Sequence, residues 1–316
     1  MERAKRRVAS LSAHLTAAAS ATFTPEQLRS YDELGYVVVK KLFDTDTLER
    51  FRARFAAIAS EKVAPPVTMS LIKDVILAKR PGNDKVTMSQ ESLTKIQDFQ
   101  DDEILFEYCK DRRILGYVEA LLGPDIRSCH TMLINKPPDL GKGTSRHPLH
   151  QDLYYFPFRG PIIASWTAME RVHPGNGCLI VVPGSHKGPL MAHGYPDWEE
   201  SNVAYHGICD IDSSNLPKYE YLEMEAGDTV FFHPLLWHGS GRNKTEGYRK
   251  AISCHYASSH TTFVSTEDTP QDVIAKEVES FAAKKLKKMG IDVALNFADI
   301  WRMRSRVIQG ASGDAW

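Results

Sequence analysis

The sequence predicts a mainly β fold with helical flanks, and its pattern of strands is typical of a jelly roll. From residue 126 to residue 257, short runs of strand-forming residues are separated by turn signals such as Pro137-Pro138 and Gly175-Asn176-Gly177. Many short strands with punctuation of this kind favour a jelly roll. The segments on either side carry apolar residues at helical spacing instead.

The first third of the chain is predicted to be largely helical. A helix is expected to begin at Thr24, whose side chain can cap it, with Pro25 in its first turn, and to end near Gly35. The β-branched run 36–39 then predicts a strand. Further helices are expected over 44–62 and 101–122, and the proline-containing stretch 63–92 between them is expected to be rich in loops.

The central part is predicted to form the strands, and the last part returns to helix. Strands are expected over 129–135, 149–156, 162–168, 178–183, 219–224, 228–233 and 249–257. Helical spacing returns over 269–289 and 296–308. Because no internal repeat or low-complexity linker divides the chain, the simplest architecture is a single catalytic domain over residues 24–316.

Composition argues against several classes of protein. The formal net charge of the 316 residues is -1, so no global basic field points to a nucleic acid partner. No apolar run approaches the length of a membrane span. The 5 cysteines are odd in number and none forms a C-x-x-C pair, which argues against both a disulfide framework and a zinc knuckle.

Residues 1–23 are interpreted as a targeting leader. They hold basic residues at positions 3, 5, 6 and 7 and a single acid, Glu2, and they lack the apolar core of a secretory signal. The pattern Arg7-Val8, five residues, then His14-Leu15 looks like an N-terminal peroxisomal targeting nonapeptide, whose helical face an import receptor can read. A peroxisomal leader is favoured over a mitochondrial transit peptide, which has a similar composition, and over a frayed tail.

His150 and Asp152 form an H-x-D pair that is a candidate metal site. On a strand, residues i and i+2 point to the same face, so both side chains can reach one ion. With 12 His and 40 acids in the chain, about 1.5 such pairs arise by chance, so the pair alone is a weak signal. A strand with polar side chains on the surface is the other interpretation.

A second histidine and an arginine complete the pattern. His233 and His238 compete as the third ligand, and Gly239 favours His238 mildly because glycine lets the backbone approach a ligand. Two imidazoles and one carboxylate occupy one face of Fe(II) and leave the other positions open. Arg249 begins a predicted strand, and its guanidinium can hold the far carboxylate of a dicarboxylic acid. Together these residues indicate a non-haem iron oxygenase that uses 2-oxoglutarate.

Longer stretches of the sequence resemble the phytanoyl-CoA hydroxylase family of peroxisomes. The similarity runs from about residue 22 to residue 308 and is densest over 94–100, 130–139, 145–152, 227–236 and 239–253. The resemblance implies a double-stranded β-helix, a cupin-like jelly roll with iron in its mouth. It also implies that the iron ligands are His150, Asp152 and His238, and so it excludes His233.

The resemblance implies a set of contacts with 2-oxoglutarate as well. Arg249 and Ser240 are expected to hold the distal carboxylate, Lys95 to add a second cation, and Met132 and Trp166 to wall the carbon chain. From the residues alone, Met132 and Trp166 could equally be barrel core, and Lys95 a surface lysine. The implied cofactor is Fe(II), with 2-oxoglutarate and O2 as co-substrates and ascorbate as the reductant.

The implied reaction is 2-hydroxylation of a 3-methyl-branched fatty acyl-CoA such as phytanoyl-CoA. This is the first step of fatty acid α-oxidation, and the implied location is the peroxisome matrix. The residues that contact CoA are not identified, because the basic residues within 284–288 indicate a solvated helix face first. The segments 158–162 and 171–174 depart from the family pattern, but both are loop-like and leave the ligand set intact.

Three other functions stay open on the sequence. An oxygenase of the same fold with another acyl-CoA or lipid substrate would keep the same ligands, so only substrate screening separates it. A non-catalytic jelly roll that binds acyl groups is disfavoured because the three ligands and Arg249 are all present. A zinc hydrolase also fits two imidazoles and a carboxylate, and dependence on 2-oxoglutarate and O2 would exclude it.

Overall fold

The computed structural model describes residues 22–73, 88–139, 146–197, 204–209, 211, 216–313 and 316. Residues 1–21, and with them nearly all of the interpreted leader, lie outside the described residues. Phe23 already belongs to the folded core, because its ring packs against Tyr117 at 4.7 Å and against Phe231 at 5.5 Å between centroids.

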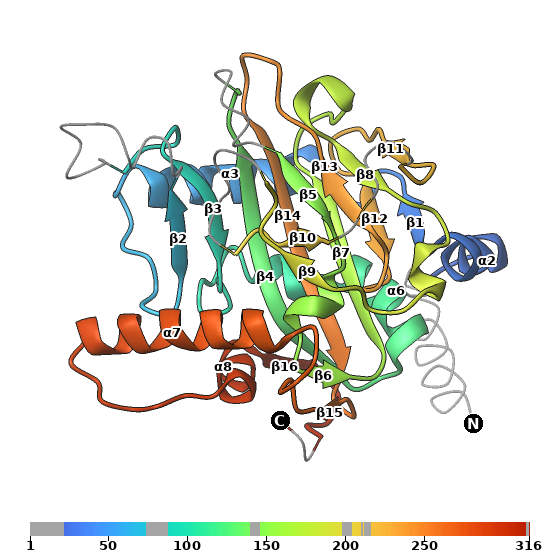
Figure 1. The fold of residues 1–316 in the computed structure, drawn as a ribbon. Coiled ribbons are helices and arrows are strands. Elements are labelled where there is room, and N and C mark those ends of the chain that lie inside the picture. The colour runs from blue at the N-terminus through green and yellow to red at the C-terminus, as the bar shows by residue number, and fades with distance from the viewer. Residues whose placement is uncertain are drawn as a thin grey trace, which may run out of the picture.

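Two antiparallel sheets face each other and form a jelly roll (Figure 1). The larger sheet has the order β1-β12-β7-β14-β4-β3-β2, with β16 paired to β4, and the smaller has the order β11-β8-β13-β5. The predicted mainly β fold with helical flanks is confirmed. The strands of the larger sheet are β1 (Tyr36–Val39), β2 (Ser70–Lys73), β3 (Leu93–Gln97), β4 (Ile126–Lys136), β7 (Ile162–Ala168), β12 (Thr229–Phe232), β14 (Arg249–Ser258) and β16 (Arg306–Gln309). Those of the smaller sheet are β5 (His147–His150), β8 (Leu179–Val181), β11 (Glu220–Leu222) and β13 (His238–Ser240).

Alternation along the central strands gives the larger sheet two different faces. On β14, Ala251 joins an apolar cluster with residues of the smaller sheet such as Leu179, whereas Ile252 joins the cluster formed with the helices. On β7, Trp166 lies in the first cluster and Ile163 in the second. The inner face of the larger sheet, which the smaller sheet partly covers, is therefore where a site can form inside the roll.

Helices from the first third of the chain cover the outer face of the larger sheet. They are α2 (Pro25–Leu34), α3 (Thr45–Ala59), α5 (Glu107–Lys110) and α6 (Arg112–Leu122). The predicted start of α2 is confirmed, because the Thr24 side chain accepts from the Gln27 amide and the Gln27 side chain accepts from the Thr24 amide. Gly35 ends the helix in the left-handed conformation, with φ of 85°.

Helices α7 (Asp272–Lys288) and α8 (Phe297–Arg304) lie across one end of the roll, below β2, β3 and β4 in Figure 1. They share a third apolar cluster with the turn η1 (Asp152–Tyr155), to which Tyr154, Ile274 and Trp301 all contribute. The remaining short elements are η2 (Pro174–Asn176), η3 (Ser185–Lys187), β6 (Phe158–Arg159), β9 (His193–Gly194), β10 (Gly207–Ile208) and β15 (Thr262–Phe263). Among the described helices, none combines the length and the apolar character that a membrane crossing requires.

The described part of the stretch 63–92 is rich in loops, as predicted, and also contains the short strand β2, which pairs with β3 and extends the larger sheet; residues 74–87 lie outside the described residues. Two predictions of helices were wrong, and each has a local cause. The helix predicted over 101–122 is divided at Asp111, whose side chain accepts from the Arg113 amide and so caps a new helix. The helix predicted over 296–308 ends at Arg304, and the chain continues as β16 along the edge of β4.

Candidate active site

Three side chains, two from strands of the smaller sheet and one from the turn η1 that follows β5, meet inside the roll. His150 ends β5, Asp152 begins η1, and His238 begins β13 directly opposite His150 in the strand pairing. Their ligand atoms all lie within 4.8 Å of one another. The Nε2 atom of His150 is 3.4 Å from Oδ1 of Asp152, and Nε2 of His238 is 3.6 Å from Oδ2.

Backbone carbonyls fix the orientation of both imidazoles. Nδ1 of His150 lies 2.9 Å from the Pro148 carbonyl oxygen, and Nδ1 of His238 lies 3.0 Å from that of Leu236. Because a carbonyl only accepts, each Nδ1 carries the proton and each Nε2 presents a lone pair toward Asp152. Ligand atoms about 2.1 Å from a metal and at right angles to each other are about 3 Å apart, so the arrangement fits one face of a single ion.

The prediction that His150 and Asp152 share a strand was wrong. The strand ends at His150 because Gln151 leaves the ladder: its backbone amide donates to Nε2 of His193 at 3.0 Å. The Gln151 side chain, which is fully buried, donates to the carbonyls of Pro189 and Leu235. The chain then turns into η1, and Asp152 reaches the ion position from the start of this turn and not from the same strand face.

The glycine beside His238 has a second role besides the expected one. A Cβ at Gly239 would lie 2.9 Å from the backbone oxygens of both His147 and Pro148. The glycine therefore allows β13 to lie close to β5, which sets the distance between the two histidines, and it also lines the cavity at the ligand atoms. His233 lies away from the site, 5.3 Å from His186 between ring centroids.

His255 completes the surroundings of Asp152, and the sequence analysis missed it. Its Nε2 lies 2.7 Å from Oδ2 of Asp152, and its side chain is 2% exposed. A carboxylate only accepts, so His255 donates through Nε2 and leaves Oδ1 of Asp152 to face the ion position. The sequence did contain a signal for this histidine. His255 is six residues after Arg249 on one predicted strand, and an even spacing places both side chains on the same face.

The protonation states of the site match those of metal ligands. Burial alone would raise the pKa of Asp152, but the neighbouring His238 and His255 outweigh it and hold that pKa well below its usual range. Burial lowers the pKa of His238 to about 4. At neutral pH the carboxylate is therefore charged and the His238 imidazole neutral, as binding of a metal cation requires.

Arg249 lies on β14 with donors that have no protein partner. It is 2% exposed, its Nη2 donates to the Gly177 carbonyl at 2.9 Å, and its buried Nε and Nη1 atoms have no hydrogen-bond partner. Burial lowers its pKa to about 10, so the guanidinium is still charged at neutral pH. A buried cation with unused donors is costly unless an anion binds it, which points to a carboxylate ligand.

Another buried basic residue, Lys136, is paired with Arg249 across the strands and was not among the predicted residues. Its Nζ donates to Oγ of Ser240 and to the carbonyl of Gly241, both at 2.8 Å. Burial, and then the charge of Arg249, holds the pKa of Lys136 well below its usual range. Ser240, which was predicted to bind the distal carboxylate of 2-oxoglutarate, is thus hydrogen-bonded to a lysine at the end of β4.

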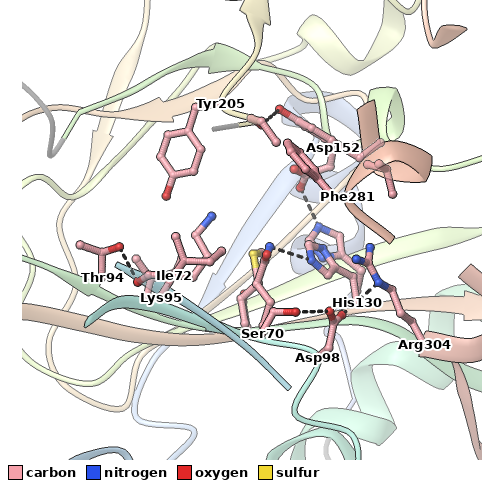
Figure 2. A pocket seen from close by; sticks show the side chains of 18 of the residues that line it. Ser70, Ile72, Thr94, Lys95, Asp98, His130, Asp152, Tyr205, Phe281 and Arg304 are labelled. Carbon is pink, nitrogen blue, oxygen red and sulfur yellow. Dashed lines mark hydrogen bonds and ion pairs between the residues drawn. The ribbon is translucent and has the colours of Figure 1, made fainter. Parts of the chain in front are cut away.

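The structure brings Met132, Trp166 and Lys95 to the same interior. Met132 on β4 and Trp166 on β7 both pair with Ser253, an inward-facing residue of β14 between Arg249 and His255. The Trp166 ring lies 5.3 Å from the Arg249 guanidinium. Lys95 on β3 is 6% exposed and its Nζ lies 4.3 Å above the Tyr205 ring, as Figure 2 shows.

All of the predicted site residues line one cavity of about 430 Å³. Its walls include Tyr155 and Phe156, two of the aromatic residues that flank the ligands in sequence. Tyr154 and Phe158, the other two of that run, are fully buried in the apolar cluster beneath it. The cavity therefore joins a metal-ligand triad, the three buried basic residues Lys95, Lys136 and Arg249, and an apolar wall.

Comparison with known proteins agrees with this geometry. A family model described as "Phytanoyl-CoA dioxygenase (PhyH)" matches residues 31–251, more than half of the chain. The chain belongs to the phytanoyl-CoA dioxygenase family. It is 52% identical to the "Phytanoyl-CoA dioxygenase, peroxisomal" of Rattus norvegicus, over 90% of this chain and 82% of the relative. It is 48% identical to the Homo sapiens protein of the same name, over 91% and 83%.

Solved structures of proteins with the same fold align with the chain at lower identity. The epimerase SnoN, solved with Fe3+, alpha ketoglutarate and nogalamycin RO, has a TM-score of 0.58 at 20% identity, over 77% of this chain and 86% of SnoN. EctD from S. alaskensis, solved with 2-oxoglutarate and 5-hydroxyectoine, has a TM-score of 0.58 at 18% identity, over 78% and 80%. At these identities the similarity concerns the fold alone, and it supports the jelly roll described above.

Proposed function

We propose that this protein is an Fe(II)- and 2-oxoglutarate-dependent dioxygenase that hydroxylates C2 of 3-methyl-branched fatty acyl-CoA such as phytanoyl-CoA. The observation that carries the proposal is that a His-Asp-His triad and the partly unpaired guanidinium of Arg249 share one buried cavity. The substrate class follows from the names of relatives about half identical over nine-tenths of the chain.

Each site residue has a proposed role. His150, Asp152 and His238 would hold the iron through Nε2, a carboxylate oxygen and Nε2. Arg249, together with Ser240, would hold the distal carboxylate of 2-oxoglutarate, and Met132 and Trp166 would wall its carbon chain. Lys95 would add a second positive charge inside the cavity.

The protein side chains would position the iron, the co-substrate and the acyl chain, and would not themselves carry out the oxidation. The bound iron, with 2-oxoglutarate and O2, would supply the oxidation that inserts oxygen into a C–H bond and yields succinate and CO2. His255 keeps the Asp152 carboxylate turned toward the ion position. Arg249, with Lys136 and Ser240 beside it, would fix the co-substrate by its far end, and the apolar wall of Tyr155 and Phe156 would exclude water from the reacting carbon.

A coupled turnover assay tests the proposal. The protein is loaded anaerobically with Fe(II) and labelled 2-oxoglutarate and then exposed to air with and without phytanoyl-CoA. We expect CO2 release coupled to an acyl-CoA product heavier by one oxygen, and no turnover by His238→Ala. Release of CO2 without a hydroxylated product would reject the substrate class but keep the oxygenase. No consumption of 2-oxoglutarate by iron-loaded protein would favour a non-catalytic acyl-binding protein, and 2-oxoglutarate-independent hydrolysis with zinc would favour a hydrolase.

We further propose that the protein acts in the peroxisome matrix, with ascorbate as the reductant that keeps its iron ferrous. The relatives named peroxisomal support the compartment, and the Arg7 to His14 pattern supports an import receptor as a partner. Changing Arg7 or His14 should leave the protein in the cytosol of cells that carry a tagged copy. Normal import of both variants would reject residues 1–23 as the signal.

A further inference from the structure

The cavity does not end at the metal-ligand triad but continues as a groove between β2 and the helices α7 and α8. The groove is lined by Val67 and Ile72 on the side of β2 and by residues of both helices on the other side. The function proposed above assigns no role to this groove, and the role inferred for it rests on that proposed function.

One face of α7 forms the long wall of this groove. The lining residues of α7 and of its C-cap recur at intervals of one helical turn, which places them on a single stripe: Ile274, Val278, Phe281, Ala282, Lys285, Leu286 and Met289. At ~1.5 Å per residue, the stripe from Ile274 to Met289 is about 22 Å long. One leaflet of fatty acyl chains in a bilayer is about 15 Å thick, so the groove is long enough for one such chain.

The floor of the groove is continuous with the metal site. His255, which donates to Asp152, stacks on His130 with 5.6 Å between ring centroids. The His130 ring in turn meets the edge of Trp301 on α8 at 5.5 Å, and Phe156 meets the same indole at 4.9 Å. A ligand that leaves the ion position along this floor passes the rings of His130, Phe156 and Trp301 before it reaches α7 and α8, and the polar side chains of Gln97 and Asp98 line the cavity beside them.

The outer part of the groove exposes large apolar side chains that lack cover. Val67 is 68% exposed, Phe281 39%, Met289 46% and Met303 56%, and all of them line the same cavity. Figure 2 shows Phe281 extending over the cavity on the side of Asp152. Contiguous exposed apolar surface that connects to a buried site is typical of a ligand groove.

The cations beside the groove are engaged by the protein itself. Lys285 donates to the Thr68 carbonyl at 3.2 Å, and Arg304 pairs with the buried Asp98 at 3.2 Å, as Figure 2 shows for the latter. The polar side chains on the opposite wall are engaged as well, because Ser70 donates to Asp98 and Gln97 contacts His130. The groove therefore offers mainly apolar surface, which suits a hydrocarbon better than the amides and phosphates of CoA.

We propose that this groove holds the hydrocarbon chain of the acyl-CoA substrate. The end of the chain near the thioester lies at Tyr155 and Ile274, and its methyl terminus lies toward Met289 and Met303. The face of α7 thus determines which chain lengths bind, and the CoA part leaves the metal site in another direction.

A pair of matched substitutions on α7 tests the proposal. Val278→Trp fills the groove, whereas Val273→Trp makes the same change at a residue that is 60% exposed and outside the cavity. We expect Val278→Trp to weaken anaerobic binding of phytanoyl-CoA to the Fe(II)- and 2-oxoglutarate-loaded protein by about tenfold or more, since many CH2 contacts are lost. Affinity for 2-oxoglutarate should be unchanged in both variants, and Val273→Trp should bind phytanoyl-CoA as the unaltered protein does.

Photo-crosslinking locates the chain without reliance on turnover. A phytanoyl-CoA analogue with a diazirine at the methyl end should label peptides that contain Met289 or Met303. Labelling confined to peptides that contain Lys95 or Tyr205, or unchanged phytanoyl-CoA binding in Val278→Trp, would overturn the groove assignment and leave the proposed activity standing. If the unaltered protein binds 2-oxoglutarate but hydroxylates no acyl-CoA, the proposed function and this inference fail together.

Discussion

The contact between His255 and Asp152 makes a quantitative prediction about iron affinity. His255→Leu removes the donor to Oδ2 of Asp152 and leaves that oxygen buried, since Asp152 is only 7% exposed. A hydrogen bond to a buried charged group contributes ~1.5–3 kcal/mol. At 1.4 kcal/mol per factor of ten, the expected loss of Fe(II) affinity is about 10- to 100-fold, in the range that is typical for groups that orient metal ligands.

The measurement is an anaerobic titration of apoprotein with Fe(II) in competition with a chromophoric chelator. His255→Gln should recover part of the affinity, because its amide can still donate to Asp152. His260→Leu is a matched control, since it breaks another histidine–aspartate contact, of 2.9 Å to Asp125, at an exposed position outside the cavity. The melting temperature of each apoprotein separates a loss of orientation from a loss of folding.

Two results would refute this reasoning. One is Fe(II) affinity in His255→Leu within twofold of the unaltered protein, which would mean that Asp152 keeps its orientation without the donor. The other is an equal loss of affinity in His255→Leu and His255→Gln at unchanged melting temperature, which would mean that the hydrogen bond is not what matters.

Three further predictions concern the cations and the histidines. Arg249→Lys keeps the charge but loses the planar fork, and we expect KM for 2-oxoglutarate to rise by about tenfold or more, measured by CO2 release; an unchanged KM would exclude Arg249 from the co-substrate site. Lys136→Met should raise the same KM while leaving Fe(II) affinity unchanged, and a loss of iron instead would assign the lysine to the metal site. Burial lowers the pKa of both His193 and His238 to about 4, against about 6.5 unfolded, so the unfolded chain binds more protons between these values. The apoprotein should therefore be fully stabilised above pH 6.5 and lose on the order of 3 kcal/mol per histidine by pH 4, visible as a falling melting temperature; a flat profile would contradict the burial argument.

Local signals in the sequence predicted those parts of the fold that depend on local physics. The cap at Thr24, the end of the helix near Gly35 and the strand over 162–168 follow from propensities and turn chemistry within a few residues, and all were confirmed. The turn at Asp152 was not predictable in this way. It arises because Gln151 binds His193 and the carbonyls of distant segments, which no periodicity in residues 149–156 reveals.

The residues of the candidate site also fall into a predictable and an unpredictable group. Residue type and spacing, together with the family resemblance, were enough to predict the triad and Arg249. His255 and Lys136 were not, because their importance comes from pairing across strands, His255 opposite His130 and Lys136 opposite Arg249. The roles of this histidine and this lysine can be recognised only once the pairing between β4 and β14 is known.

Strand β14 has a consequence for how the protein tolerates insertions and deletions. Arg249, Ser253 and His255 all point inward because they differ by even numbers of positions, and Ile252 and Cys254 between them pack against the helices. Loss or gain of a single residue between Arg249 and His255 would turn one of the two outward and move its partners to the helix side. The strand thus fixes the distance between the co-substrate position and the metal position. The number of residues between Arg249 and His255 is therefore more tightly constrained than the identity of most side chains along the strand.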